Sequence, residues 1–116
     1  MITLIGYKKC STCANIEKLL KEKQIEYVYR HIDKENPTSS EIRTWHQKTK
    51  LDIKKFFNTS GVLYRKKELA KKLPNYTLEE KYDLLATDGK LVKRPILITE
   101  NSIYVGKQVK EYLQSL

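Results

Sequence analysis

The chain has 116 residues, a length that suits one domain around one core. Its residues are 40% hydrophobic and 32% charged, which is typical of a folded protein and excludes a disordered one. No apolar run approaches the roughly 18 residues of a membrane span, so we expect no membrane partner. The net charge of +9 could favour nucleic acid, an acidic protein partner or an anionic substrate, but the simpler interpretation is that the lysines solvate helix faces. Because the aromatic and basic motifs of nucleic-acid-binding modules are missing, we do not expect direct binding to nucleic acid.

The opening quarter of the chain predicts a strand, a helix and a second strand. Residues 2–7 are short, β-branched and apolar, as in a buried strand. The segment STCANIEKLLKEKQ has Cys13, Ile16 and Leu20 at helical spacing, and residues 26–32 alternate as a second strand does. Cys10 and Cys13 therefore lie at the first strand-to-helix junction.

The middle of the chain predicts short helices that begin at recognisable caps. Thr38 with Glu41, and Thr77 with Glu80, each match the T-x-x-E pattern of a capping box. Asp52 suits the cap of a short helical segment that follows it. The remaining predictions are a turn at residues 58–61, a helix at residues 64–73 and a helix end at residues 87–90.

The last quarter predicts a hairpin and a closing helix. Residues 94–99 form a compact apolar strand, and residues 102–105 suit its hairpin partner. Val109, Leu113 and Leu116 lie on one face of the helix that follows. The order is β-α-β, a helical insertion at about 38–88, and β-β-α. It predicts a single α/β domain, residues 1–116, in which helices cover a mixed four-stranded sheet.

The position of Cys10 favours a reactive thiol. At the start of a helix, unpaired N–H groups and the positive end of the helix dipole stabilise an anion. Lys8 and Lys9 place further positive charge nearby. Both effects lower the pKa of a thiol, and the thiolate is the nucleophile. Ser11 and Thr12 add hydroxyl donors for a sulfur anion or a bound oxyanion.

Cys13 lies one turn further along the helix, on the side of the core residue Ile16. An exposed attacking thiol at Cys10 and a shielded resolving thiol at Cys13 would suit this spacing. A zinc site needs about four ligands, and the chain offers only one cysteine pair, with His31 and His46 in other elements. Two inert buried cysteines are another interpretation, but C-x-x-C between a strand and a helix favours redox chemistry.

Taken together, four segments resemble the arsenate reductase (ArsC) and Spx family of thioredoxin-like proteins. They are the CSTC opening of the helix, LDIKKFFNTSGVLYRKK (51–67), LLATDGKLVKRPILI (84–98) and YVGK (104–107). The resemblance covers nearly the whole chain and implies a thioredoxin-like fold. Within the family, the middle segment is similar to that of the small, uncharacterised reductase-like members rather than the regulators.

The resemblance also implies roles for single residues. Pro95 would follow a cis peptide bond and sit against the active cysteine, Cys10. In members that reduce arsenate, three arginines hold the oxyanion, and guanidinium forks match that geometry. Arg94 matches one of them, whereas Asn58 and Gly106 stand where the other two are expected.

Three functions follow as hypotheses from the residues and the resemblance. The first is a small thiol–disulfide oxidoreductase in which Cys10 and Cys13 react, Arg94 and Lys9 stabilise the thiolate or an acidic substrate, and thioredoxin, glutaredoxin or glutathione donates electrons. We expect no bound cofactor or metal. The second is an Spx-like redox switch that binds the C-terminal domain of the RNA polymerase α subunit. The third is arsenate reduction with glutathione or glutaredoxin.

The expected compartment is the cytoplasm. The N-terminus, MITLIGYKKC, has its charges after the apolar residues and lacks the apolar length of a signal peptide. Thiols in the cytoplasm are mostly kept reduced, and a disulfide there is usually catalytic or sensing. This expectation agrees with a cysteine pair that cycles between two redox forms.

Overall fold

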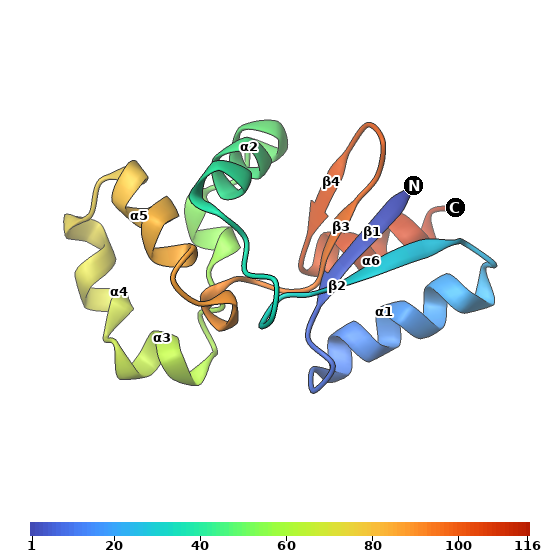
Figure 1. The fold of residues 1–116 in the computed structure, drawn as a ribbon, viewed down its shortest axis with the longest axis horizontal. Coiled ribbons are helices and arrows are strands. Elements are labelled where there is room, and N and C mark those ends of the chain that lie inside the picture. Colours follow the sequence, from blue (N-terminus) through green and yellow to red (C-terminus); the bar gives the residue numbers. More distant parts are fainter. The chain divides into compact units, whose positions relative to one another are not determined.

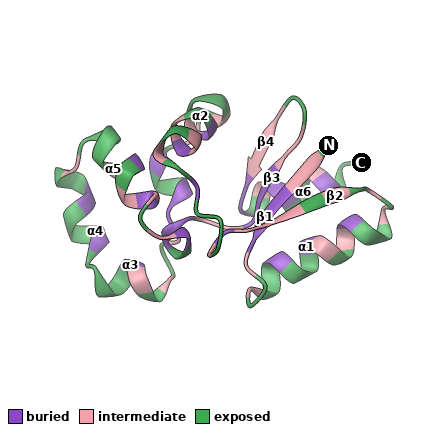
Figure 2. Ribbon diagram, viewed as in Figure 1, coloured by how far each residue is buried: buried purple, intermediate pink, exposed green.

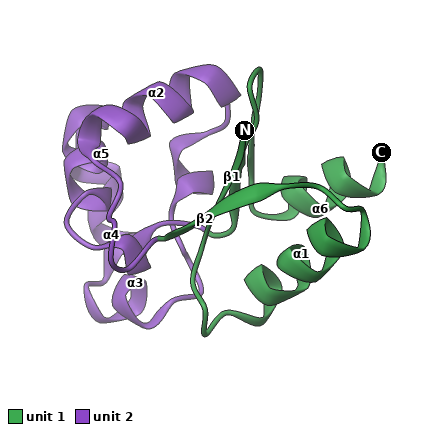
Figure 3. Ribbon diagram, turned by 45° about the vertical axis from the view of Figure 1, so that its right-hand side comes forward, with its two compact units in different colours: residues 1–31, 94–116 green, residues 32–93 purple.

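The computed structural model describes residues 1–116 and divides them into two compact units. One unit joins residues 1–31 with residues 94–116, and the other holds residues 32–93 (Figure 3). The first unit contains the sheet and both cysteines, whereas the second is helical. The segment predicted as a helical insertion, at about 38–88, lies within the second unit.

The first unit is built on four strands in the order β2-β1-β3-β4 (Figure 1). β1 pairs in parallel with β2 and antiparallel with β3, and β3 pairs antiparallel with β4. The mixed four-stranded sheet of an α/β protein is therefore confirmed. The strands span Ile2–Gly6 (β1), Tyr27–His31 (β2), Ile96–Ile98 (β3) and Ile103–Val105 (β4).

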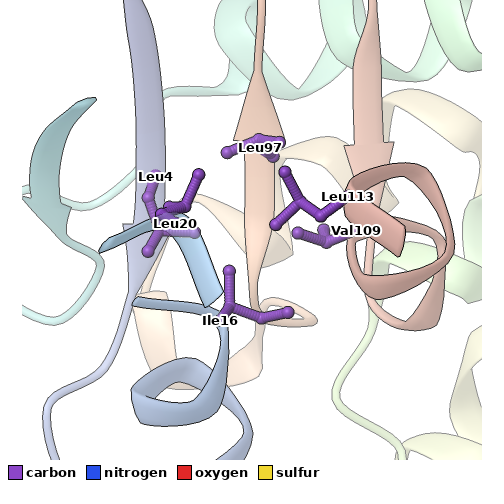
Figure 4. Close-up of a cluster of buried hydrophobic side chains, with 6 residues drawn as sticks. All are labelled: Leu4, Ile16, Leu20, Leu97, Val109 and Leu113. Carbon is purple, nitrogen blue, oxygen red and sulfur yellow. The ribbon is translucent and has the colours of Figure 1, made fainter. Parts of the chain in front are cut away.

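Two helices of the first unit, α1 (Ser11–Glu22) and α6 (Lys107–Gln114), pack on the same face of the sheet. Leu4 of β1 lies opposite Leu97 of β3, so both side chains point to one face. Residues of both helices complete a cluster that is almost fully buried (Figure 4). The cluster consists of Leu4, Ile16, Leu20, Leu97, Val109 and Leu113. This packing fixes the first turn of α1 at the end of β1.

The closing helix is shorter than its apolar pattern predicted. It ends at Gln114, and Leu116 is 61% exposed, so Leu116 does not belong to the core stripe. The strand predicted over residues 94–99 is also shorter and covers only β3. The last four carbonyl groups of a helix have no N–H partners within the helix, and helix ends fray for that reason.

The second unit consists of short helices, of which α2 and α5 begin as predicted. The Thr38 side chain accepts a hydrogen bond from the Glu41 N–H, and the Glu41 carboxylate accepts one from the Thr38 N–H. Thr77 and Glu80 repeat the same capping box. Figure 2 shows buried positions alternating with exposed ones along these helices. The elements are α2 (Ser39–Thr49), α3 (Val62–Lys66), α4 (Leu69–Lys72), α5 (Leu78–Leu85) and 3₁₀ turns at Ile53–Phe56, Leu73–Asn75 and Gly89–Leu91.

The single helix predicted at residues 64–73 is wrong, because two helices occupy this stretch. α3 begins at Val62, directly after the predicted turn, and Glu68 takes the left-handed conformation (φ 52°) between α3 and α4. Tyr64 and Leu69 are both buried, although five residues apart would put them on different faces of one continuous helix. The break at Glu68 turns both side chains inward.

None of these helices is long and apolar enough to span a membrane.

Loss of a side chain from the core of the first unit should destabilise the protein. For Leu113→Ala we expect the free energy of unfolding to fall by about 2–5 kcal/mol, because the buried leucine leaves a cavity between α6 and the sheet. Gln114→Ala, at the next and exposed position, should change it by less than about 0.5 kcal/mol. Urea unfolding followed by circular dichroism measures both, and equal losses would contradict this description of the core.

Candidate active site at Cys10 and Cys13

Cys10 occupies the N-cap position of α1. Its backbone is extended (φ −95°, ψ 119°), and its N–H donates to the Tyr7 carbonyl oxygen at 2.9 Å. No side chain caps this end of the helix, and no acidic residue lies in its first turn. The thiol of Cys10 is partly exposed. Because Cys10 is at the N-cap position, its thiol lies near the first N–H groups of the helix, which have no carbonyl partner within the helix.

The surroundings of Cys10 favour its thiolate. Burial raises the pKa of the thiol, but hydrogen bonds from the Cys13 N–H, the Cys13 thiol, the Arg94 guanidinium and the Thr12 N–H outweigh it, so that the pKa is lowered. These are donors to the charged form, which is why they stabilise it. A lowered pKa is the property that a nucleophilic cysteine needs.

Cys13 has the opposite environment. It is 1% exposed, and burial is the largest of the effects that raise the pKa of its thiol to about 12. Cys10, as a hydrogen-bond partner and as a nearby charge, raises it further. The Tyr7 N–H donates to the Cys13 sulfur at 3.5 Å and opposes this rise. Both cysteines are free thiols in this structure.

Close packing at the end of β1 holds Cys13 in place. A Cβ atom at Gly6 would lie 3.2 Å from the Cys13 sulfur and 2.7 Å from the Tyr29 hydroxyl oxygen. A methyl group at this position would therefore collide with the Tyr29 hydroxyl and press on the Cys13 sulfur, so glycine allows the close packing seen here. The shielded position predicted for Cys13 follows from this contact as well as from helical spacing.

Arg94 is the cation beside the Cys10 sulfur. Its guanidinium lies 4.9 Å from the centre of the Tyr7 ring, within the range of a cation–π contact, and it hydrogen-bonds Cys10. The peptide bond between Arg94 and Pro95 is cis, as the resemblance implied. Pro95 is buried, and its carbonyl oxygen accepts a hydrogen bond from the Gly106 N–H at 2.8 Å.

Lys8, expected near the thiolate, is engaged elsewhere. Its ammonium forms an ion pair with Glu17 at 2.8 Å and lies 3.9 Å from the centre of the Tyr29 ring. The Tyr27 hydroxyl donates to the other oxygen of Glu17 at 2.6 Å. Neither Lys8 nor Lys9 is among the groups that lower the pKa of Cys10.

Two of the residues beside the thiols were not found from the sequence. Tyr7 and Tyr29 carry no motif, and they lie near Cys13 only because the strands and α1 bring them together. Of the two hydroxyl residues that were predicted, Thr12 acts on Cys10 through its backbone N–H, and Ser11 is exposed.

Two positions where the resemblance implies arginines are occupied by Gly106 and Asn58, and their surroundings differ. Gly106 has φ 61° and ψ −127°, a conformation that side-chain-bearing residues rarely adopt, so arginine would be strained there. Asn58 lies in the helical unit. A Cβ atom placed on Gly61 would be 2.7 Å from the side-chain nitrogen of Asn58, so these two residues pack closely. No group of three or more His, Cys, Asp and Glu side chains is placed to hold a metal ion.

The chain belongs to the ArsC family, whose model matches residues 5–115. Among curated proteins it is similar to the uncharacterized protein YusI of Bacillus subtilis, with 40% identity over 105 residues, 90% of this chain and 89% of YusI. It is also 29% identical to the regulatory protein MgsR of B. subtilis and 27% identical to the global transcriptional regulator Spx of Staphylococcus haemolyticus. These matches cover 97% and 91% of this chain, and 88% and 79% of the two regulators.

Solved structures show the same fold. An ArsC family related protein from Bacteroides fragilis superposes with a TM-score of 0.91 at 46% identity, over 97% of this chain and 95% of that protein. A possible arsenate reductase from Streptococcus mutans gives a TM-score of 0.85 at 43% identity, with coverage of 91% and 90%. The thioredoxin-like fold predicted from the resemblance is confirmed.

Arg94 and Lys9 can be compared as sources of thiolate stabilisation. For Arg94→Met we expect the pKa of Cys10 to rise, because removing a hydrogen-bonded cation disfavours the charged form. Lys9→Met removes the same charge from the residue that precedes Cys10, and it should leave the pKa of Cys10 unchanged. The rate of alkylation by iodoacetamide against pH measures the pKa, in a Cys13→Ser background so that one thiol reacts.

Arg94→Lys should restore part of the effect, since it keeps the charge but loses the planar hydrogen-bonding group. A pH profile that moves with Lys9→Met and not with Arg94→Met would contradict the assignment of Arg94.

Proposed function

We propose that the protein is a cytoplasmic thiol–disulfide oxidoreductase with Cys10 as the nucleophile and Cys13 as the resolving thiol. The observation that carries this proposal is the contrast between the two thiols. Cys10 is partly exposed with a lowered pKa, whereas Cys13 is buried with a pKa of about 12. Two cysteines that served only for packing would not need one partly exposed thiol with a lowered pKa beside one buried thiol with a raised pKa.

In the first step, the Cys10 thiolate attacks one sulfur of a substrate disulfide. A bond forms between Cys10 and that sulfur, the substrate S–S bond breaks, and the other substrate sulfur leaves as a thiolate. Arg94 beside Cys10 stabilises the thiolate before attack. Lys9 is exposed, and the proposal leaves it a role in attracting an acidic substrate.

In the second step, Cys13 loses its proton and attacks the Cys10 sulfur. The Cys10–Cys13 disulfide forms, and the substrate leaves as a thiolate that carries both electrons. Once Cys10 is in a mixed disulfide, the negative charge that raised the pKa of Cys13 is gone, while the Tyr7 N–H still favours the Cys13 thiolate. Glutathione, glutaredoxin or thioredoxin would then reduce the pair.

The proposal is tested first by a redox titration of the purified protein in glutathione buffers. We expect a reversible two-electron transition between about −200 and −270 mV, the range of thioredoxin and glutaredoxins. Mass-tagged alkylation of Cys10 and Cys13 reports the fraction of disulfide at each potential. If no intramolecular disulfide forms at any potential, Cys13 is not the resolving thiol.

The two cysteine variants serve as each other's controls. Cys10→Ser should abolish disulfide exchange with a model substrate, whereas Cys13→Ser should accumulate the mixed disulfide on Cys10. The accumulated species is identified by intact mass and disappears on reduction. Accumulation on Cys13 in the Cys10→Ser protein would reverse the assignment of roles.

A second candidate is a redox-gated regulator with no turnover. It is favoured by the matches to MgsR and Spx, which are named as regulators and cover most of this chain. On this hypothesis the oxidation state of Cys10 and Cys13 would control affinity for the RNA polymerase α subunit. We place it after the oxidoreductase because the middle segment, residues 51–67, is similar to that of the reductase-like members rather than the regulators.

A binding experiment separates the two candidates. Reduced protein and protein oxidised to the Cys10–Cys13 disulfide are each immobilised and titrated with purified RNA polymerase α subunit. For an oxidoreductase we expect no redox-dependent binding in this assay, because its partners are small thiol donors and disulfide substrates. Binding that changes more than about tenfold between the two forms, equivalent to about 1.4 kcal/mol, would favour the regulator.

A further inference from the structure

A groove of about 460 Å³ opens between α1 and α6, and the core residue Ile16 forms part of its lining. α1 contributes Thr12 and Asn15, and α6 contributes Lys107, Lys110 and Gln114. All residues that line the groove belong to the first unit. The groove is formed by two helices that pack on the same face of the sheet. Its volume lies within the range of about 300–1,000 Å³ that is common for ligand pockets.

One end of this groove reaches the proposed nucleophile. Thr12 lines the groove, and its N–H donates a hydrogen bond to the Cys10 sulfur. Gly106, which also lines it, donates its own N–H to the carbonyl oxygen of Pro95, the residue that follows Arg94. A chain seated in the groove would therefore be delivered to Cys10 at this end.

The groove carries two cations that nothing in the protein neutralises. Lys107 and Lys110 are exposed, and neither ammonium takes part in a hydrogen bond or an ion pair. Glu111 is the single acidic residue in the lining. By contrast, Lys8 pairs with Glu17, and Arg94 contacts the Tyr7 ring and Cys10. Lys9, next to Cys10, is exposed but does not line the groove.

We infer that this groove binds an acidic peptide segment of the disulfide substrate, with carboxylates on Lys107 and Lys110 and the reactive cysteine at Cys10. The inference rests on the proposed function and names the substrate class for it. A polyanion such as nucleic acid would also be attracted to two lysines, but it has no sulfur for the thiolate to attack. The position of the groove beside Cys10 therefore favours a protein substrate.

Short peptides test this specificity. Each carries one central cysteine as a mixed disulfide with thionitrobenzoate, flanked by aspartate and glutamate, by serine, or by lysine. Attack of Cys10 on the peptide sulfur releases thionitrobenzoate, and Cys13 then releases the peptide thiol. With the reduced protein in excess, each peptide reacts once, and the absorbance of thionitrobenzoate gives the second-order rate constant. We expect this rate constant to be about tenfold higher for the acidic peptide than for the serine peptide, and lowest for the lysine peptide. The difference should shrink between about 0.01 and 1 M salt, because the lysines are exposed.

The variant that tests the groove is Lys107→Glu with Lys110→Glu. It should abolish or invert the ratio of acidic to basic peptide turnover, and the serine peptide provides the reference rate in the same protein. Lys18→Glu with Lys66→Glu is the matched control, since it makes the same change of net charge at two exposed positions outside the groove. The control should keep the preference for the acidic peptide.

A binding measurement separates failure of this inference from failure of the proposed function. Peptides with serine in place of the central cysteine are titrated into the reduced protein and followed by fluorescence anisotropy. Binding of the acidic peptide that the Lys107/Lys110 variant loses, without any turnover, would support the groove and overturn the oxidoreductase. Turnover that is equal for all three peptides would overturn the groove and leave the oxidoreductase standing.

Two further outcomes would also overturn the inference. One is an acidic preference that the Lys107/Lys110 variant keeps in full, because the preference would then come from other cations. The other is a single-stranded oligonucleotide that displaces the acidic serine peptide at lower concentration than the peptide itself binds, which would assign the groove to nucleic acid.

Discussion

The chemistry of this protein depends on the first turn of α1, where two thiols three residues apart meet different surroundings. Cys10 occupies the N-cap position and receives hydrogen bonds from Cys13, Arg94 and Thr12, which favour its thiolate. Cys13 faces the end of β1 at Gly6, where burial favours its thiol. The division holds only while α1 keeps its position on the sheet, because the same turn supplies donors to one sulfur and removes water from the other.

The helices of eight or more residues begin differently in the two units. α2 and α5, in the helical unit, satisfy their first N–H groups with the capping boxes of Thr38 and Thr77. α1 and α6 begin at Cys10 and Gly106, with no side-chain cap and no acid in the first turn. Uncapped helix starts leave N–H groups and positive potential for a sulfur anion or an acidic substrate.

Membership of the ArsC family does not by itself assign a substrate. The family includes proteins described as arsenate reductases and proteins described as regulators, and this chain is similar to both kinds. Within the first unit, the cation beside Cys10 is Arg94, and the next cations toward α6 are Lys107 and Lys110 on an open groove. An open groove of this kind suits an extended peptide better than it suits a small oxyanion, which needs an enclosed site.

The sequence by itself determined the order of the strands and of the helices beside them, both capping boxes and the place of Cys10 at the first strand-to-helix junction. Those features depend on local chemistry: apolar periodicity, T-x-x-E spacing and a cysteine pair at a helix start. Only the tertiary structure decided that Arg94 rather than Lys8 stands beside the thiolate, that Gly6 leaves room for Cys13, and that the helix at residues 64–73 breaks at Glu68. Each of these depends on contacts between residues distant in sequence, or on which face of a helix the core can bury, and neither is encoded in local spacing.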